Sequence, residues 1–277
     1  MKFKKFVKFD CKHGIGKQWS KYVGAIVLFT IFSLSLFSSY LSTPAASRKL
    51  SLGDYLFNIW AGMSEYVPSP DNPIRIPALW MLMLLWMFYL TLYYPYHNLT
   101  GIGKQLLIVS GNRYSWWFSK CIWIILCVLT YYSIGFAVTL MWTIFSGGIL
   151  DLTVSKYVLD FLKINQSNMP LGPYRLNVGT LLLPILVTTA ICMIQLILSV
   201  LIRPIFSYLI TVAYLFLSVY FQNSFFIGNY MMAARNTSFS LSGMTPWHGA
   251  VIAVFVIIVS IVGGSAIFNK IDIIDRE

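Results

Sequence analysis

The fold depends on Tyr93 to Lys120, YYPYHNLTGIGKQLLIVSGNRYSWWFSK, a polar, glycine-punctuated interruption between two long apolar runs. Residues 101–110 have room for about three turns of helix, roughly 15 Å at ~1.5 Å per residue, whereas a bilayer span needs ~20 apolar residues. Gly111 and Asn112 are typical of a helix end, and Ser115 is a typical N-cap for the next helix. The stretch therefore predicts a short helix outside the membrane, held between two spans.

The composition places the whole chain among integral membrane proteins. Of its 277 residues, 58% are apolar and only 10% are charged, against about 25% charged residues in soluble domains. The formal net charge of +11 could suggest nucleic acid, but the basic residues are distributed as a membrane topology requires, so we expect no nucleic-acid partner. The four cysteines show no metal-type or redox-type spacing and are interpreted as small buried hydrophobes.

Six apolar runs predict six transmembrane helices, and we expect residues 1–277 to form a single, all-α transmembrane domain. The expected spans are about 22–41, 78–96, 121–145, 181–202, 205–221 and 250–268. Before the first span, residues 1–21 carry seven lysines against one aspartate, with phenylalanines interleaved. This pattern predicts an N-terminal amphipathic helix at an anionic membrane surface.

The polar loops contain further short amphipathic segments. Leu52, Leu56, Ile59, Trp60 and Met63 recur at helical spacing, which predicts a helix lying on the membrane surface. A similar piece covers 150–163, and the interrupted apolar segment within 222–248 is too short to span, so it predicts short outer-face helices. Trp116 and Trp117 are expected to be anchors at the lipid headgroups.

The charge distribution predicts the orientation of the chain. The N-terminus, Tyr93 to Lys120, the turn at Arg203 and the C-terminal tail hold thirteen of the twenty Lys and Arg residues. Their net charge is +9, thirteen minus four acids, against +2, seven minus five, for the opposite loops. The positive-inside rule therefore predicts that both termini and Tyr93 to Lys120 are cytoplasmic.

The sequence offers no catalytic or metal-binding constellation. The six expected spans contain no internal Asp, Glu, Lys, Arg or His, which disfavours an ion-coupled transporter or an intramembrane enzyme. The three histidines lie at different span ends, on both sides of the membrane. GIGK occurs twice, at 14–17 and 101–104, but neither copy completes a Walker A motif. We expect no enzyme activity, bound metal or cofactor in this chain.

The arrangement of these elements, with GNRYSWWFSK at 111–120 entering the third span, resembles the exporter-type permease subunits of bacterial ATP-binding-cassette (ABC) transporters. The likeness is to those of Gram-positive bacteria that handle peptides, and it covers nearly the whole chain. It implies a second permease subunit, identical or related, and two cytoplasmic ATPase subunits that bind ATP and magnesium. It also implies a bacterial cytoplasmic membrane, with 101–111 as the coupling helix that docks on an ATPase.

Ile102, Leu106 and Val109 share one face of the expected coupling helix and suit an apolar groove in a partner. The alternative is that this face rests in lipid headgroups. Lys104 and Arg113 could pair with acids of the ATPase, or they could only reflect the positive-inside rule. The expected ATPase-coupling residues are Ile102, Lys104, Gln105, Leu106, Val109 and Arg113.

The functional prediction is an ATP-driven export permease for an amphipathic or hydrophobic substrate, with a peptide as the favoured class. The first alternative is a non-transporting immunity or sensor protein that binds an antimicrobial peptide or a lipid through its outer loops. Met81, Met83, Trp86, Met87 and Tyr89 could line an apolar path, since methionine adapts to varied ligands, or they could simply pack against neighbouring helices.

Overall fold

The computed structural model describes residues 2–43, 49–66, 68, 76–110, 112–164, 169–170 and 173–271. This part of the chain is helical, with only isolated β-bridges. The helices are α1 Lys2–Asp10, α2 Trp19–Leu41, α3 Leu52–Trp60, α4 Ala78–Thr100, α5 Ile102–Ser110, α6 Arg113–Phe145, α7 Lys156–Phe161, α8 Val178–Leu201, α9 Pro204–Tyr220 and α10 Pro246–Lys270.

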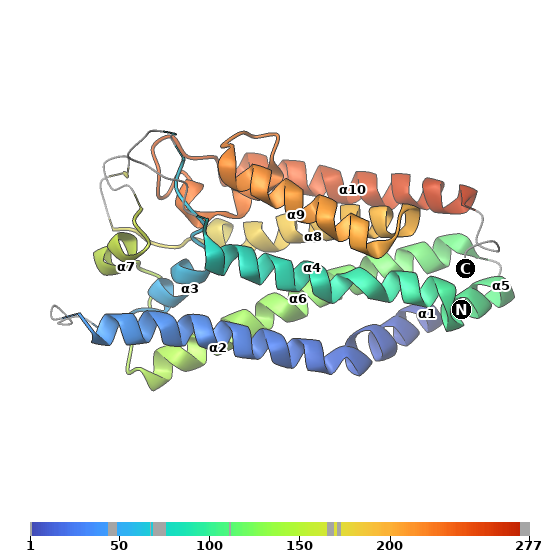
Figure 1. Ribbon diagram of the computed structural model, residues 1–277, viewed down its shortest axis with the longest axis horizontal. Coiled ribbons are helices and arrows are strands. Elements are labelled where there is room, and N and C mark those ends of the chain that lie inside the picture. Colours follow the sequence, from blue (N-terminus) through green and yellow to red (C-terminus); the bar gives the residue numbers. More distant parts are fainter. Residues whose placement is uncertain are drawn as a thin grey trace.

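Five helices are long and apolar enough to cross a membrane: Phe3–Leu41, α4, α6, α8 and α10. The first combines α1 and α2, which are joined by a π-helical turn at Cys11–Ile15 and a 3-10 turn at Gly16–Gln18. The long helices lie along the long axis of the molecule, with α8 in contact with α4, α6, α9 and α10 (Figure 1). The prediction of an all-α, multi-pass membrane protein is thereby confirmed.

The fifth expected span corresponds to α9, which has only 17 residues and is shorter than the five spanning candidates. It packs against α8 and α4 and follows α8 after a two-residue connection, as the sequence predicts. Arg203 occupies its N-cap position and Pro204 its first turn, where the missing N–H of proline costs nothing.

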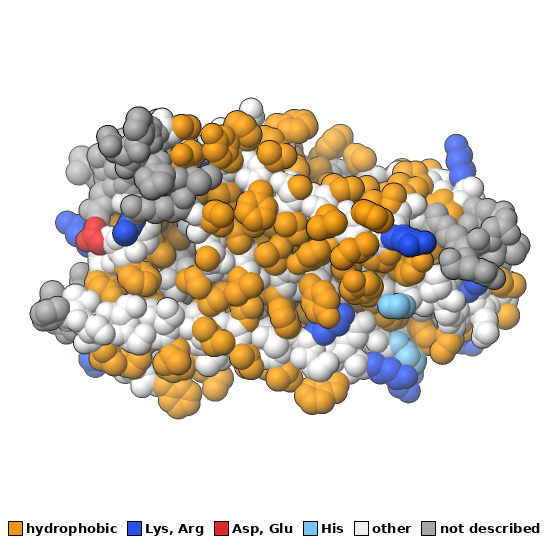
Figure 2. Space-filling model, viewed as in Figure 1, with side chains coloured by type: hydrophobic (Ala, Val, Ile, Leu, Met, Phe, Trp, Pro, Cys, Tyr) orange, Lys and Arg blue, Asp and Glu red, His pale blue; other side chains and the backbone are white. Residues whose placement is uncertain are grey.

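The visible surface has the pattern of a membrane protein. Hydrophobic side chains cover the middle of the face seen in Figure 2, and most of its Lys and Arg side chains lie toward the end that holds α5 and both termini. Exposed aliphatic residues include Ile31 of α2, Leu209 of α9 and Val262 of α10. Their exposure fits lipid as the surrounding solvent, because water would penalise so large an apolar area.

The expected surface helix at Leu52 to Met63 is the main correction to the predicted fold. Residues 53–61 are buried, and α3 packs against α2, α4, α6 and α7. Asp54 and Asn58, which lie on the side of the helix opposite the predicted apolar face, are also buried, so α3 is covered all round. The buried Asp54 carboxylate accepts hydrogen bonds from the backbone N–H groups of Ser51 (2.9 Å) and Ser155 (2.7 Å), so the helix start tolerates burial.

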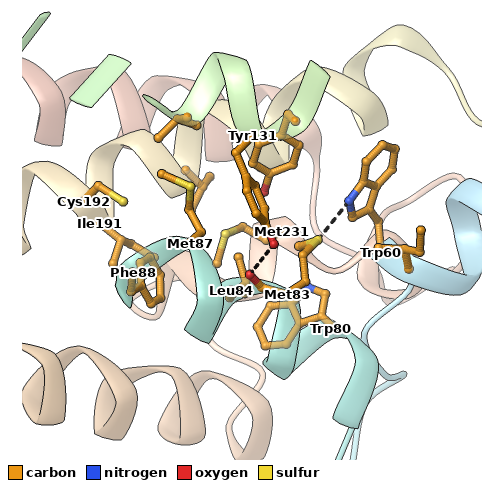
Figure 3. Packing of buried hydrophobic residues seen from close by; sticks show 14 of the residues in the cluster. Trp60, Trp80, Met83, Leu84, Met87, Phe88, Tyr131, Ile191, Cys192 and Met231 are labelled. Carbon is orange, nitrogen blue, oxygen red and sulfur yellow. Dashed lines mark hydrogen bonds between the residues drawn. The ribbon is translucent and has the colours of Figure 1, made fainter. Parts of the chain in front are cut away.

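The methionines of α4 belong to the core. Met81, Met83 and Met87 are buried, which supports the packing interpretation over an apolar path. The Trp60 indole N–H points at the Met83 sulfur, 3.2 Å away, and the Tyr131 hydroxyl donates to the Met83 carbonyl at 2.9 Å (Figure 3). These contacts join α3 and α6 to the middle of α4.

The segment between α9 and α10 forms two short 3-10 helices, Ile227–Met231 and Ala233–Arg235, which confirms the prediction of non-spanning pieces. Arg235 is 1% exposed and donates to the carbonyls of Ser218 and Val219, both at 2.7 Å, and to the Met63 carbonyl at 3.1 Å. One guanidinium therefore joins the end of α9 to the chain that follows α3.

Candidate functional site

The α5 helix lies at the end of the molecule that also holds both termini (Figure 1). It is connected to α4 through Gly101 alone, and α6 begins at Arg113. The side chain of Asn112 caps α6 by accepting a hydrogen bond from the Ser115 backbone N–H at 2.9 Å. Asn112, and not Ser115, is therefore the N-cap, while Gly111 lies outside the described residues.

Gly103 allows α5 to fold back closely on α4. A Cβ atom at this position would lie 2.2 Å from the Asn98 side-chain oxygen and 2.3 Å from the Asn98 carbonyl oxygen. The buried Leu107 faces the same interior side of α5. Two of the nine α5 residues thus fix the helix against the rest of the chain.

The other apolar side chains of α5 face outward. Ile102 is 63% exposed, Leu106 37%, Ile108 65% and Val109 85%. The three residues predicted to share a face are thus all accessible, together with Ile108 and the polar Gln105. Lys104, also predicted at this surface, is half-buried. We call Ile102, Leu106, Ile108 and Val109 the α5 surface.

A buried ion pair joins Lys120 of α6 to Asp10 of α1, and each side chain is 1% exposed. The Asp10 carboxylate also accepts hydrogen bonds from the hydroxyl groups of Ser119, at 2.7 Å, and Tyr94, at 2.8 Å. The Lys120 ammonium lies 4.7 Å from the centre of the Tyr94 ring and 5.0 Å from that of Trp116. Both charges are thus surrounded by partners, as burial requires.

This ion pair corrects the expectation that the spans contain no charge. The expected third span began at residue 121, but α6 begins at Arg113 and carries Lys120 inside the protein. The sequence contained two signals for the pair: Asp10 is the lone acid among the lysines of the first segment, and Lys120 directly adjoins an apolar run. Neither signal identifies the partner.

Trp116 and Trp117 do not face the lipid headgroups. The rings are 0% and 1% exposed, and Trp116 stacks on Phe268 of α10 with ring centres 4.6 Å apart. The Trp116 indole N–H donates to Asn98 at 3.0 Å, and that of Trp117 donates to the Ile261 carbonyl at 3.0 Å. Both side chains therefore join α6 to α10. The prediction that they anchor the chain at the lipid headgroups is wrong.

Arg113 also connects helices. Its guanidinium donates to the carbonyls of Asn269 and Ile271, both at 2.8 Å, and so satisfies the C-terminal end of α10. The side chain is half-buried in this position. The hydrogen bonds of its side chain therefore lie within the chain.

The geometry describes a short helix whose two ends continue directly into α4 and α6, with α1 and α10 bound to the same region. The Asp10–Lys120 ion pair joins the start of α6 to α1, and the contacts of Arg113 and Trp116 join it to the end of α10. In the described part of the chain, no three His, Cys, Asp or Glu side chains gather as metal ligands.

These features define a multi-pass helical membrane protein with an exposed apolar helix at one end. Residues 53–274 match the family described as Protein of unknown function (DUF2705), and the chain belongs to this family. Comparison with curated proteins and with solved structures gives no match.

Proposed function

We propose that the protein is the transmembrane permease subunit of an ATP-driven ABC exporter, with α5 as its coupling helix. The observation that carries the proposal is the outward orientation of Ile102, Leu106 and Val109 on a helix that is tied to the body at both ends. Burial of each of these side chains in an apolar groove of a partner would contribute about 1.5–3 kcal/mol to docking.

The occupant of the α5 surface in this proposal is a cytoplasmic ATPase subunit. An amphipathic helix commonly binds a protein groove through apolar residues spaced three and four apart. The lysine-rich α1 segment lies at the same end of the molecule as α5 (Figure 1), and it would favour a partner with an acidic surface around the groove. Two such ATPases and a second permease, identical or related, complete the proposed transporter.

Movement of the ATPases would reach the spans through the chain connections of α5 and the ion pair at the start of α6. Gly101 links α5 directly to α4, and the Asp10–Lys120 ion pair fixes α1 to α6. Because packed cores switch between discrete arrangements and do not deform continuously, a shift of α5 would tilt α4 and α6 as units. This tilt is the step that alternately opens and closes the substrate path in the proposed cycle.

The proposal includes a six-span topology with α9 as the short fifth span, and cytoplasmic termini in a bacterial membrane. It also includes export of an amphipathic or hydrophobic substrate, with a peptide as the favoured class. The concentration of Lys and Arg at the α5 end supports the orientation.

The decisive experiment is co-purification of the chain with ATPases encoded beside it, followed by an ATPase assay. We expect a Walker-motif protein to accompany the wild type. The double variant Leu106→Glu with Val109→Glu should lose that protein, or its dependence on the permease, because it places two charges in an apolar groove. Both residues are exposed, so insertion and folding should be preserved.

The matched control carries the same change at the opposite end of the molecule, Leu150→Glu with Leu241→Glu, at residues that are 63% and 72% exposed. This variant should bind the ATPase as the wild type does. A wild-type chain that purifies alone under gentle detergent conditions, or equal binding by both double variants, would reject the coupling role of α5.

A further inference from the structure

A groove opens between the segment that follows α9 and the first turns of α10, and we call it the α9–α10 groove. Its polar part is a cavity of about 500 Å³, which falls within the range of small-molecule sites, ~300–1,000 Å³. Its apolar part, of about 370 Å³, shares Ser224, Tyr230 and His248 with the polar part. The start of α10 lies at the end of the molecule opposite α5 (Figure 1), so the groove is separate from the proposed ATPase-docking surface.

The two parts of the α9–α10 groove differ in the side chains that line them. Glu65 lines the polar part, together with the hydroxyl-bearing Ser242 and Thr245, and all three are exposed. Trp247 and Val251 line the apolar part and are 74% and 51% exposed. These groups are accessible to a ligand. A molecule that fills both parts therefore needs a polar end and an apolar end.

The boundary between the two parts is held by contacts within the chain. Tyr230 packs directly on α10, because a Cβ atom at Gly249 would lie 2.5 Å from its ring. The Thr245 hydroxyl and Nδ1 of His248 are 2.7 Å apart, which orients the imidazole where the two parts meet. The groove is thus largely formed before a ligand arrives, as small-molecule sites usually are.

Glu65 determines the charge that a ligand needs. It is the only Asp, Glu, Lys or Arg among the described residues that line the polar part. Within the described chain its carboxylate forms no ion pair, and it accepts one long hydrogen bond, 3.4 Å from the Ser242 hydroxyl. An exposed carboxylate with so few partners is open to a cationic group.

The buried Arg235 lies close to this carboxylate in the chain fold but does not occupy it. One of its hydrogen bonds goes to the carbonyl of Ser64, the neighbour of Glu65. The other N–H groups of the guanidinium donate to the oxygens of Met63, Ser218, Val219 and Asn229. Since a guanidinium has five N–H donors, none is left for Glu65.

A primary ammonium group joined to an apolar side chain matches the order of groups along the groove. The N-terminus of an apolar peptide has this arrangement, and its first amide adds N–H and C=O groups that suit the polar Asn223 and Ser224. Phosphatidylethanolamine also carries a primary ammonium, but its phosphate would lie beside the carboxylate of Glu65 and be repelled. The charges of the groove therefore favour the peptide.

We propose that the α9–α10 groove binds the N-terminus of apolar peptides, with the ligand ammonium at the Glu65 carboxylate and an apolar side chain against Trp247 and Val251. The site can be occupied in the isolated chain, so its test does not depend on the ATPase-coupling role of α5.

The test uses the full chain in nanodiscs of phosphatidylcholine, a lipid without a primary ammonium. The two probes, leucyl-phenylalaninamide and 4-methylpentanoyl-phenylalaninamide, differ only in an ammonium group against hydrogen. The indole N–H resonance of Trp247, assigned with Trp247→Phe, is followed by NMR during titration. Leucyl-phenylalaninamide should shift it saturably, and the uncharged probe should bind about tenfold more weakly because it offers Glu65 no cation. The resonance of Trp19, which is 67% exposed and assigned with Trp19→Phe, should not move.

Glu65→Gln provides the second arm, because it removes the negative charge at an exposed position and should make the two probes bind equally. Asp151→Asn is the matched control, since it makes the same change of charge at an exposed carboxylate outside the groove. It should keep the tenfold preference. Absence of a saturable Trp247 shift up to the solubility limit, or equal binding of both probes to the wild type, would overturn the proposal. The wild-type comparison decides the question even where Glu65→Gln fails to fold.

A third arm distinguishes the peptide from a lipid headgroup. Phosphatidylethanolamine replaces part of the phosphatidylcholine in the nanodiscs, and the titration with leucyl-phenylalaninamide is repeated. The affinity of the peptide should be unchanged. A saturable Trp247 shift caused by phosphatidylethanolamine, with weaker binding of the peptide, would overturn the assignment to peptides and identify the lipid as the occupant.

Discussion

The Lys120 ammonium and the Asp10 carboxylate form an ion pair from which solvent is almost excluded. Removing one partner leaves an uncompensated buried charge, and such changes cost about 3–5 kcal/mol. We therefore expect Lys120→Met to lower the free energy of unfolding by about that amount. The double variant Asp10→Leu with Lys120→Met should be more stable than the single one. Reversible unfolding in mixed detergent micelles measures both.

The control for this cycle is Lys21→Met, which removes a half-buried lysine whose ammonium lies 4.8 Å from the centre of the Tyr89 ring. It should cost less than ~1 kcal/mol, the scale of an accessible cation–π contact. Equal costs for Lys120→Met and Lys21→Met would refute the special importance of the buried pair.

Gly103 is expected to determine how closely α5 packs against Asn98 of α4. Gly103→Ala places a methyl group within 2.3 Å of both oxygens of Asn98, and overpacking of this kind costs about 1–3 kcal/mol. Gly263→Ala in α10 is the matched change, since a Cβ there meets nothing within 4 Å. It should be neutral or stabilising. The measurement is the free energy of unfolding, which should fall in Gly103→Ala and stay equal or rise in Gly263→Ala. Equal changes in the two variants would contradict the close approach of α5 to α4.

The loop after α6 should show a pH-dependent stability. The hydroxyl of Thr153 and the backbone N–H of Leu152 donate to Asp151 and lower the pKa of this exposed carboxyl from its ordinary value of 3.8. Because the folded-state pKa is the lower one, the stabilisation is present above pH 3.8 and is lost as the pH falls through the folded-state pKa.

The melting temperature of Asp151→Asn should accordingly lie below that of the wild type near neutral pH, and the difference should disappear in strong acid. Thr153→Val should remove part of the same difference, because it deletes the largest cause of the pKa shift. A difference between Asp151→Asn and the wild type that persists unchanged below the folded-state pKa would contradict this linkage.

The two ends of the molecule should be accessible from opposite sides of the membrane. Ile108 in α5 and Leu241 before α10 are 65% and 72% exposed. In a Cys11→Ser background, a membrane-impermeant maleimide should label Leu241→Cys in intact cells and Ile108→Cys only after the membrane is opened. Labelling of both from outside would refute the placement of the ends. The reverse pattern would refute the predicted orientation.

The long helices could be predicted from the sequence because apolar length alone specifies them. The turn between α8 and α9 followed from Arg203 and Pro204, whose local chemistry is independent of the remaining chain. The outward face of α5 followed from the spacing of Ile102, Leu106 and Val109. Each inference used information contained within a few adjacent residues.

The incorrect predictions concern residues whose surroundings are formed by distant parts of the chain. The α3 helix has an amphipathic spacing that suits a membrane surface, yet other helices cover its remaining side. Trp116 has the sequence context of a headgroup anchor, but Phe268 and Asn98 cover its ring. Lys120 and Asp10 are 110 residues apart. The spacing of apolar residues along the sequence does not show which distant residues pair.

The separation of Asp10 and Lys120 has a consequence for biosynthesis. The ribosome completes the acidic partner long before the basic one, and α2 and α4 are synthesised between them. The Asp10–Lys120 contact can therefore form only after the start of α6 has been synthesised. A chain interrupted earlier would carry the Asp10 carboxylate without this basic partner, and that unpaired charge would distinguish a partial chain from a complete one.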